Sequence, residues 1–289
     1  MNYRHSFHAG NFADVMKHAV LVRIVRAMQR KARGFLYVDT HAGRGRYDLA
    51  SAARGDTLER KPEWPEGIGR LWNRPKLPEV LADYVAVVKA YDQKLGNLET
   101  GPRFYPGSPR IVRALARPQD RLALFEKQQD EAGALRTEFS RSSAVGIQSA
   151  DGYAGLRGQL PAPEKRALVL IDPPFEAKDE FEKVTATVAD ALRRAPATTI
   201  IVWYPLTERA RVDAFFADLA ELALPPTFSL ELTVVGPLHP MKMKGSGLVV
   251  INPPWELDQE LSRAFTWLGE ILAQDHGARA ELRWLVKEA

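Results

Sequence analysis

Seven short apolar runs recur along this 289-residue chain, and four of them end at an acidic residue. Runs of this length bounded by turn signals are typical of strands buried in a sheet. Helical patterns fill most of the gaps, as at 178–195 and 207–224. This alternation predicts an α/β fold with a doubly wound, mainly parallel sheet. The runs are FLYVD (35–39), RLALFE (121–126), AVGIQSAD (144–151), ALVLID (167–172), TTIIVWYP (198–205), SLELTVV (229–235) and GLVVIN (247–252).

Two segments depart from the alternation. Only a short segment without a helical pattern joins the last two runs, so we expect them to form an antiparallel pair at the sheet edge. Residues 48–107 contain at least two helical stretches, and a connection that long usually has structure of its own. We therefore expect one main domain, residues 1–47 and 108–289, and a helical insert subdomain at 48–107.

Composition excludes several classes of protein. No segment has the roughly 20 uninterrupted apolar residues of a membrane span, and AVLVRIV near the N-terminus is too short for a signal peptide. Cysteine is absent, which excludes disulfides and thiolate metal sites and agrees with a cytoplasmic location. The net charge of +4 permits a polyanionic partner without requiring one. We expect a monomer that needs no metal.

The turn after the first run, HAGRGRY, bears on the cofactor. Asp48 stands where the dinucleotide fingerprint has a third glycine, and no lysine followed by Ser or Thr marks a P-loop. The turn is therefore a poor cradle for pyrophosphate. Gly43 and Gly45 still let a ligand approach the backbone closely, which suits S-adenosylmethionine, a cofactor without phosphate.

Later strand ends favour the same cofactor. Glu126 follows LALF, where a carboxylate suits two ribose hydroxyls. Asp151 and Gly152 follow the next strand and offer an acceptor and a backbone N–H to an adenine edge. Each acid alone is more often a helix cap or a solvated turn. Three such strand ends in chain order favour a nucleoside site.

The fourth strand ends in DPPF, which suits methyl transfer to an amino group. The lone pair of the exocyclic nitrogen of adenine is delocalised into the ring, so a site must free it. The Asp172 carboxylate and the Pro173 carbonyl offer acceptors for the two amino hydrogens, and Pro173 and Pro174 fix their positions in advance. Phe175 offers a face on which an extruded base stacks.

A second proline motif, NPPW, follows the last run. The fourth strand in chain order leads to Asp172, whereas Asn252 ends a late edge strand. We interpret NPPW as a rigid strand exit with Trp255 packed, not as a reaction centre.

Several stretches together resemble the bacterial 23S rRNA adenine-N6 methyltransferase J family: YRHSFHAGNFADVMKH, DTHAGRGRY, YPGSP and LIDPPF. The resemblance covers essentially the whole chain and implies a class I, Rossmann-like methyltransferase. Such an enzyme uses S-adenosylmethionine to methylate one adenine of 23S rRNA, giving N6-methyladenosine and S-adenosylhomocysteine. The resemblance also implies that Asp172 is the proton acceptor and Tyr3 a substrate contact. The cofactor contacts that it implies are His18, His41, Ser108, Glu126, Asp151, Gly152 and Asp172. Phe175 stands where the family often has tyrosine.

We expect the N-terminal segment to cover the active site and to meet the RNA through Tyr3, Arg4 and Lys17. Basic residues continue along the predicted helix at 12–31, so Lys17 is interpreted as a phosphate contact. We also expect the 23S rRNA to be methylated before the subunit is fully assembled.

Four alternatives stay open at this point. A guanine-N2 rRNA methyltransferase family also carries DPPF, and DNA adenine is a rival substrate. A nicotinamide-dependent reductase would share the fold but needs a better glycine fingerprint. An RNA-binding module would keep the basic charge but has no need of Asp172.

Overall fold

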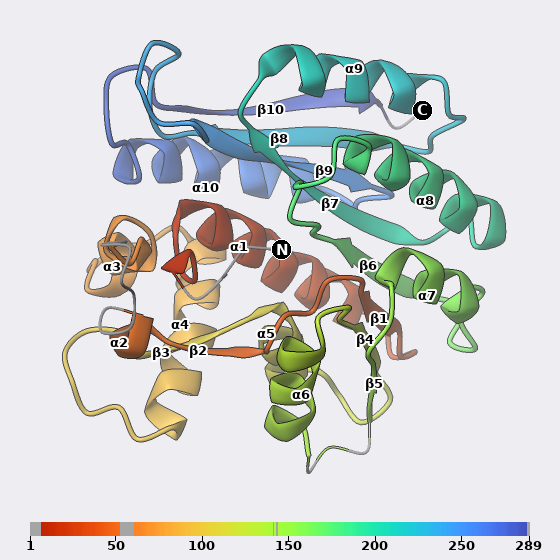
Figure 1. Ribbon diagram of the computed structural model, residues 1–289, viewed down its shortest axis with the longest axis horizontal. Helices are drawn as coiled ribbons and strands as arrows, with labels where there is room; N and C mark the ends of the chain where they lie inside the picture. The colour runs from red at the N-terminus through yellow and green to blue at the C-terminus, as the bar shows by residue number, and fades with distance from the viewer. Residues whose placement is uncertain (1–6, 53–60, 141, 143, 288–289) are drawn as a thin grey trace.

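The computed structural model describes residues 7–52, 61–140, 142 and 144–287. Its helices and strands follow the alternation expected from the sequence (Figure 1). In chain order they are α1 (Phe12–Gln29), β1 (Leu36–Asp39), β2 (Arg46–Asp48), α2 (Leu49–Ala52), η2 (Trp64–Glu66), α3 (Ile68–Trp72), α4 (Glu79–Lys94), β3 (Phe104–Pro106), α5 (Ser108–Leu115), β4 (Arg121–Phe125), α6 (Gln129–Glu138), β5 (Val145–Gln148), α7 (Gly152–Gln159), β6 (Ala167–Ile171), α8 (Glu180–Arg194), β7 (Thr199–Leu206), α9 (Arg209–Ala220), β8 (Thr227–Thr233), β9 (Gly245–Ile251), α10 (Leu257–Ile271) and β10 (Arg279–Val286).

The main sheet has eight strands among the described residues, in the order β10-β8-β9-β7-β6-β1-β4-β5. β1 pairs in parallel with β4 and β6, β4 pairs in parallel with β5, and β6 with β7. The pairs β7–β9, β9–β8 and β8–β10 are antiparallel. The mainly parallel α/β sheet with antiparallel strands toward one edge is therefore confirmed.

The outermost strand β10 was not expected from the sequence. Its residues, RAELRWLV, alternate charged and apolar side chains, and their exposure alternates along most of the strand. An edge strand with one solvated face has this pattern, so it lacks the apolar run that marked the other strands. β10 pairs outside β8, which gives three antiparallel strands where two were expected.

Helices cover both faces of the sheet (Figure 1). α1, α5 and α10 pack on one face through a core that includes Tyr37 and Leu170. α7, α8 and α9 pack on the other face through Val38 and Val169. Successive strand residues point to opposite faces, so each strand contributes to both cores. None of the described helices is both long and apolar enough to cross a membrane.

The insert begins and ends at a two-stranded ladder. β2 and β3 pair antiparallel, with Tyr47 opposite Tyr105, so the chain leaves and re-enters the main domain at one place. From this ladder α4 packs against α1, and its buried residues Leu81, Tyr84 and Val88 join the same core as α1. The division into a main domain and a subdomain at 48–107 stays a prediction.

Helix α1 is buried along most of its length, between the sheet and the neighbouring helices α4, α5 and α10. Two basic residues of this helix are paired within the protein. Arg23 is bonded to Glu260 on α10, and Arg26 lies 3.0 Å from Asp83 on α4. These two side chains therefore join helices.

The NPPW exit lies where β7 begins, because β9 is antiparallel to β7 and Ile251 pairs with Ile200. Asn252 Nδ2 donates to the carbonyls of Pro196 at 2.7 Å and Thr198 at 3.0 Å, so its contacts are those of a strand exit. The expectation that Trp255 is packed is wrong, since it is 70% exposed. Positive φ values at Asn252 (50°) and Glu256 (61°) turn the chain twice, and Trp255 lies outside between them.

Candidate active site

The carboxyl ends of four parallel strands meet at one edge of the sheet. Asp39 ends β1, Glu126 follows β4, Asp151 follows β5 and Asp172 follows β6. β1 lies between β4 and β6, so the order of the strands reverses there. The crevice outside such a switch point is where open α/β sheets bind ligands.

Asp172 forms an ion pair with Lys17 from α1. Lys17 Nζ lies 2.5 Å from Asp172 Oδ2 and 2.9 Å from Asp14 Oδ1. The side chains of Lys17 and Asp172 are 6% and 17% exposed. Burial alone would lower the pKa of Lys17, but the charges of Asp14 and Asp172 outweigh it and hold that pKa well above its ordinary value. Lys17 is therefore protonated and fixes the Asp172 carboxylate in place.

The interpretation of Lys17 as a phosphate contact has to be corrected. Its ammonium group is buried and already shared by two carboxylates, so it does not meet a phosphate on the surface of a large RNA. The sequence does not reveal the pair with Asp172, which lies 155 residues away. The spacing of three between Asp14 and Lys17, which places both on one helix face, is the only local signal of this role.

The DPPF turn carries an aromatic side chain, Phe175, three residues after Asp172. Phe175 has φ of 50°, an uncommon conformation for an aromatic residue that surrounding structure must maintain. Its ring centroid lies 4.7 Å from that of Phe181 and 5.9 Å from that of Trp203. Pro173 is buried, whereas Pro174 and Phe175 are half-buried. Part of the ring is therefore accessible at the strand end.

Glu126 is bonded to the glycine turn. Gly43 N donates to Glu126 Oε2 at 2.9 Å, and Gln128 N donates to Oε1 at 2.8 Å. Burial raises the pKa of Glu126, against the opposing effect of these backbone bonds. Gly43 and Gly45 have φ of 58° and 78°, which favours glycine at both positions. Carboxylate oxygens can each accept more than one hydrogen bond, so Glu126 has spare acceptor capacity.

Asp151 and Gly152 begin helix α7. Asp151 Oδ1 accepts from Tyr153 N at 3.0 Å and Ala154 N at 3.3 Å. Burial tends to raise the pKa of Asp151, but these bonds and Lys127 lower it. A Cβ atom on Gly152 would lie 1.9 Å from the carbonyl oxygen of Thr40. Gly152 thus allows α7 to begin directly against the end of β1, and its cofactor contact stays a prediction, as does that of Asp151.

Asp39, which was not among the predicted site residues, ends β1, the strand between β4 and β6. It is fully buried and its Oδ2 accepts from Ser108 Oγ and the Tyr37 hydroxyl, both at 2.7 Å. Burial raises the pKa of Asp39 to about 6, although these two bonds oppose the shift. Burial also lowers the pKa of His41 to about 4, and its ring lies 5.0 Å from that of Tyr153. The sequence signal that could have identified Asp39 is its position as the acidic residue at the end of the apolar run FLYVD.

Replacing Asp39 by asparagine is expected to change how stability depends on pH. The raised pKa means that Asp39 favours the folded state below pH 4 and opposes it above pH 6, where the buried carboxylate is ionised. The variant should therefore gain stability relative to wild type as pH rises from 4 to 7, by up to about 3 kcal/mol. Urea unfolding at several pH values measures this difference. A difference that is constant with pH would contradict the buried ionisation.

His18 lies deeper than the strand ends. It is 1% exposed, and its Nδ1 lies 2.7 Å from the Tyr105 hydroxyl, which in turn lies 2.8 Å from the Tyr84 hydroxyl. His18 therefore packs between α1, α4 and β3, and its contact with a cofactor stays a prediction. Tyr3 and Arg4 lie outside the described residues.

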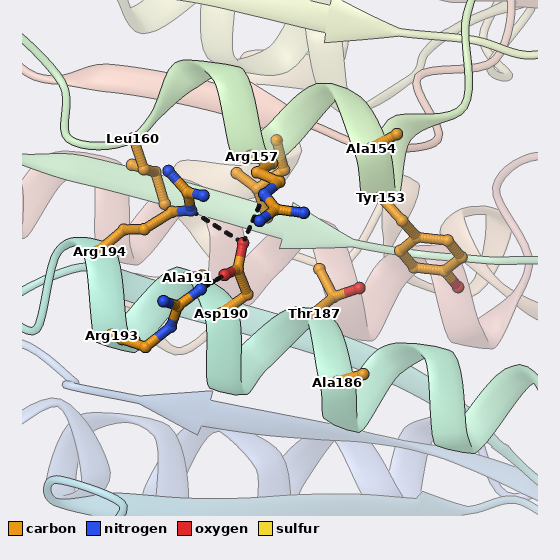
Figure 2. A pocket seen from close by; sticks show the side chains of 11 residues that line it. Tyr153, Ala154, Arg157, Leu160, Ala186, Thr187, Asp190, Ala191, Arg193 and Arg194 are labelled. Carbon is orange, nitrogen blue, oxygen red and sulfur yellow. Dashed lines mark hydrogen bonds and ion pairs between the residues drawn. The ribbon is translucent and has the colours of Figure 1, made fainter.

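A cavity of about 410 Å³ lies between α7 and α8 (Figure 2). Its lining contains none of the expected site residues. Arg157, Arg193 and Arg194 converge on Asp190, with Arg194 Nε 2.9 Å from Asp190 Oδ2. The lining of this cavity is thus an ion-pair network between the two helices. Among the described residues, no group of three or more His, Asp or Glu is arranged to hold a metal ion.

Comparison with known proteins places the chain in a family. A family model described as "Ribosomal RNA large subunit methyltransferase D, RlmJ" matches residues 32–286. Proteins named ribosomal RNA large subunit methyltransferase J from Escherichia coli (strain K12) and Haemophilus influenzae are 39% and 37% identical over 288 residues, all of each chain. The crystal structure of a Legionella pneumophila protein superimposes with a TM-score of 0.84 at 32% identity, covering 96% of this chain and 97% of that one. The chain belongs to the RlmJ family of ribosomal RNA large subunit methyltransferases, and it is an enzyme.

Proposed function

We propose that this enzyme transfers a methyl group from S-adenosylmethionine to N6 of an adenine in 23S rRNA. The observation that carries the proposal is the ion pair of Lys17 with Asp172 at the exit of β6, three residues before the half-buried Phe175. The DPPF turn thus carries both a fixed carboxylate and an aromatic side chain, the two features that an extruded adenine requires. Family membership supports both the reaction and the RNA substrate.

The residues at the neighbouring strand ends fit S-adenosylmethionine. Glu126 has spare acceptor capacity for ribose hydroxyls, and its bond to Gly43 holds the glycine turn at the same strand end. Asp151 and the backbone of Gly152 suit the adenine of the cofactor, while Ser108 and His41 line the adjoining end of β1. The bound cofactor would supply an electrophilic methyl group.

Asp172 and Pro173 would orient the amino group of the target adenine. Lys17 occupies Oδ2 of Asp172, and among the described residues no hydrogen bond is made to Oδ1. One amino hydrogen would donate to this oxygen and the other to the Pro173 carbonyl, so that the nitrogen lone pair is free. A nitrogen that gains a methyl group becomes strongly acidic, and an ionised carboxylate is then base enough to take its proton. Lys17 positions that carboxylate by its charge.

Substituting Glu126 by alanine is expected to weaken binding of S-adenosylmethionine by about 1.5 to 3 kcal/mol. The reason is the loss of charge-assisted hydrogen bonds to ribose, together with the bond that holds Gly43. Calorimetry on the folded variant measures the affinity. Glu131→Ala is the matched control, because this nearby acid is paired with Arg44. Unchanged affinity in Glu126→Ala would remove this residue from the cofactor site.

The substrate is tested by offering labelled S-adenosylmethionine with naked 23S rRNA, assembled large subunits or duplex DNA. Nucleoside analysis then identifies the product. The proposal expects N6-methyladenosine in naked rRNA and less in assembled subunits, because the RNA would be modified before assembly is complete. N2-methylguanosine, or N6-methyladenine in DNA, would instead favour the rival substrates that share the DPPF motif.

A further inference from the structure

The loop between β8 and β9, residues 234–244, stands at the same edge of the sheet as Asp172. β9 is antiparallel to β7, and Gly245 pairs with Leu206 near the carboxyl end of β7. β7 is parallel to β6, whose carboxyl end leads to Asp172. The start of β9 also contacts α1, since Ser246 Oγ lies 3.5 Å from Met16 Sδ, next to Lys17.

This loop and the α10–β10 loop form a cavity of about 400 Å³. Its lining combines prolines and an apolar side chain with polar groups, namely Gly236, Pro237, Leu238, His239, Pro240, Asp275 and His276. Ligand pockets commonly have this volume. A flat nucleobase suits such walls, because apolar side chains and histidine rings give stacking faces and the polar groups reach base edges.

The walls of this cavity are held in place by the fold. Gln274 N donates to Val234 O at 2.8 Å, and Val234 N donates to Lys244 O at 2.9 Å. A Cβ atom on Gly236 would lie 2.7 Å from the His276 carbonyl oxygen, so the two loops cross closely. The cavity therefore exists before a ligand arrives, which lowers the entropic cost of binding.

The surface around this cavity suits a polyanionic ligand. Lys242 is exposed and Lys244 half-buried, with Lys244 Nζ 3.4 Å from the Met241 carbonyl. His239 Nδ1 accepts from Met241 N at 3.1 Å, which leaves Nε2 as the donor of the ring. Leu238 is 98% exposed, and Pro237 and Pro240 beside it are exposed as well. Proteins that bind single-stranded nucleic acid combine positive charge with side chains against which the bases stack.

We infer that this cavity binds one unstacked nucleotide of the RNA substrate, away from the target adenine. Leu238 and the prolines stack on its base, and Lys242 contacts its phosphate. Across the sheet, β8 lies three strand spacings from β6. Along the strand direction, the loop lies about three residues beyond the level of Asp172. The cavity therefore lies about 15 to 20 Å from Asp172. That distance corresponds to about five stacked nucleotides. This inference rests on the proposed rRNA substrate.

Leu238→Asp tests it, because the side chain is almost fully exposed and its replacement leaves the fold intact. The expected result is a rise of at least about fivefold in KM for a 23S rRNA transcript, from lost stacking and added repulsion. kcat and the affinity for S-adenosylmethionine should stay within twofold of wild type. Leu98→Asp is the matched control, since Leu98 is 97% exposed in the insert, and its KM should stay unchanged.

A crosslinking experiment locates the contact directly. Transcripts containing 4-thiouridine should crosslink to residues 236–244 or 274–276 in wild type, and this crosslink should weaken in Leu238→Asp. An unchanged KM with crosslinks elsewhere would overturn the inference while wild type still methylates the transcript. A defect seen only with RNA that carries ribosomal proteins would overturn it in favour of a protein partner. Failure of wild type to methylate 23S rRNA would instead reject the proposed function.

Discussion

Asp172→Ala is expected to lower the single-turnover methylation rate by about 10²- to 10⁴-fold, while RNA and cofactor still bind. The carboxylate would act on the amino group in the transition state, so its loss should appear in the chemical step more than in affinity. Lys17 keeps its second partner, Asp14, at 2.9 Å, so the variant should stay folded. Rapid quenching at saturating cofactor measures the rate, and a thermal melt checks the fold.

Asn252→Ala is the matched control, because it alters the corresponding position of the second proline motif. Its amide joins the strand exit to the carbonyls of Pro196 and Thr198, so it should lose stability and keep its methylation rate. Asn252→Gly tolerates the positive φ and separates backbone strain from the lost bonds. An active Asp172→Ala beside a folded, inactive Asn252→Ala would mean that the reaction centre has been assigned to the wrong motif.

Lys17→Met is expected to damage both stability and catalysis. It leaves the buried carboxylate of Asp14 and the adjacent Asp172 without their shared cation, which should reduce the free energy of unfolding by about 3 to 5 kcal/mol at neutral pH. The methylation rate should also fall by about 10²- to 10³-fold, because Asp172 is no longer held in place. Urea unfolding and single-turnover rates measure the two effects separately.

Arg26→Met provides a control on the same helix. Arg26 pairs with Asp83 at the surface, where an ion pair contributes at most about 1 kcal/mol, so stability and rate should change little. RNA binding distinguishes the two interpretations of Lys17. Weakened RNA affinity with a normal rate at saturating RNA would restore its interpretation as a phosphate contact and contradict the role assigned to the Asp172 pair.

Much of the fold was predictable because its signals are local. Buried strands such as ALVLID need continuous apolar side chains, and the parallel order of those strands follows from the helices between them. β10 was not predicted because an edge strand with one solvated face has no continuous apolar run. Trp255 was misjudged because its exposure depends on two positive φ values in the chain around it.

The sequence alone determined the strand ends and therefore the places of Glu126, Asp151 and Asp172. Parallel strands bring their carboxyl ends to one edge whatever the details of packing, so these residues converge by topology. Only the tertiary structure decided that Lys17 from α1 pairs with Asp172, 155 residues away. It also placed the β8–β9 loop at the reaction edge, since the direction of β9 is set by its pairing with β7. Such contacts depend on how helices and strands that are distant in the sequence pack against one another. The spacing of residues along the chain does not determine this packing.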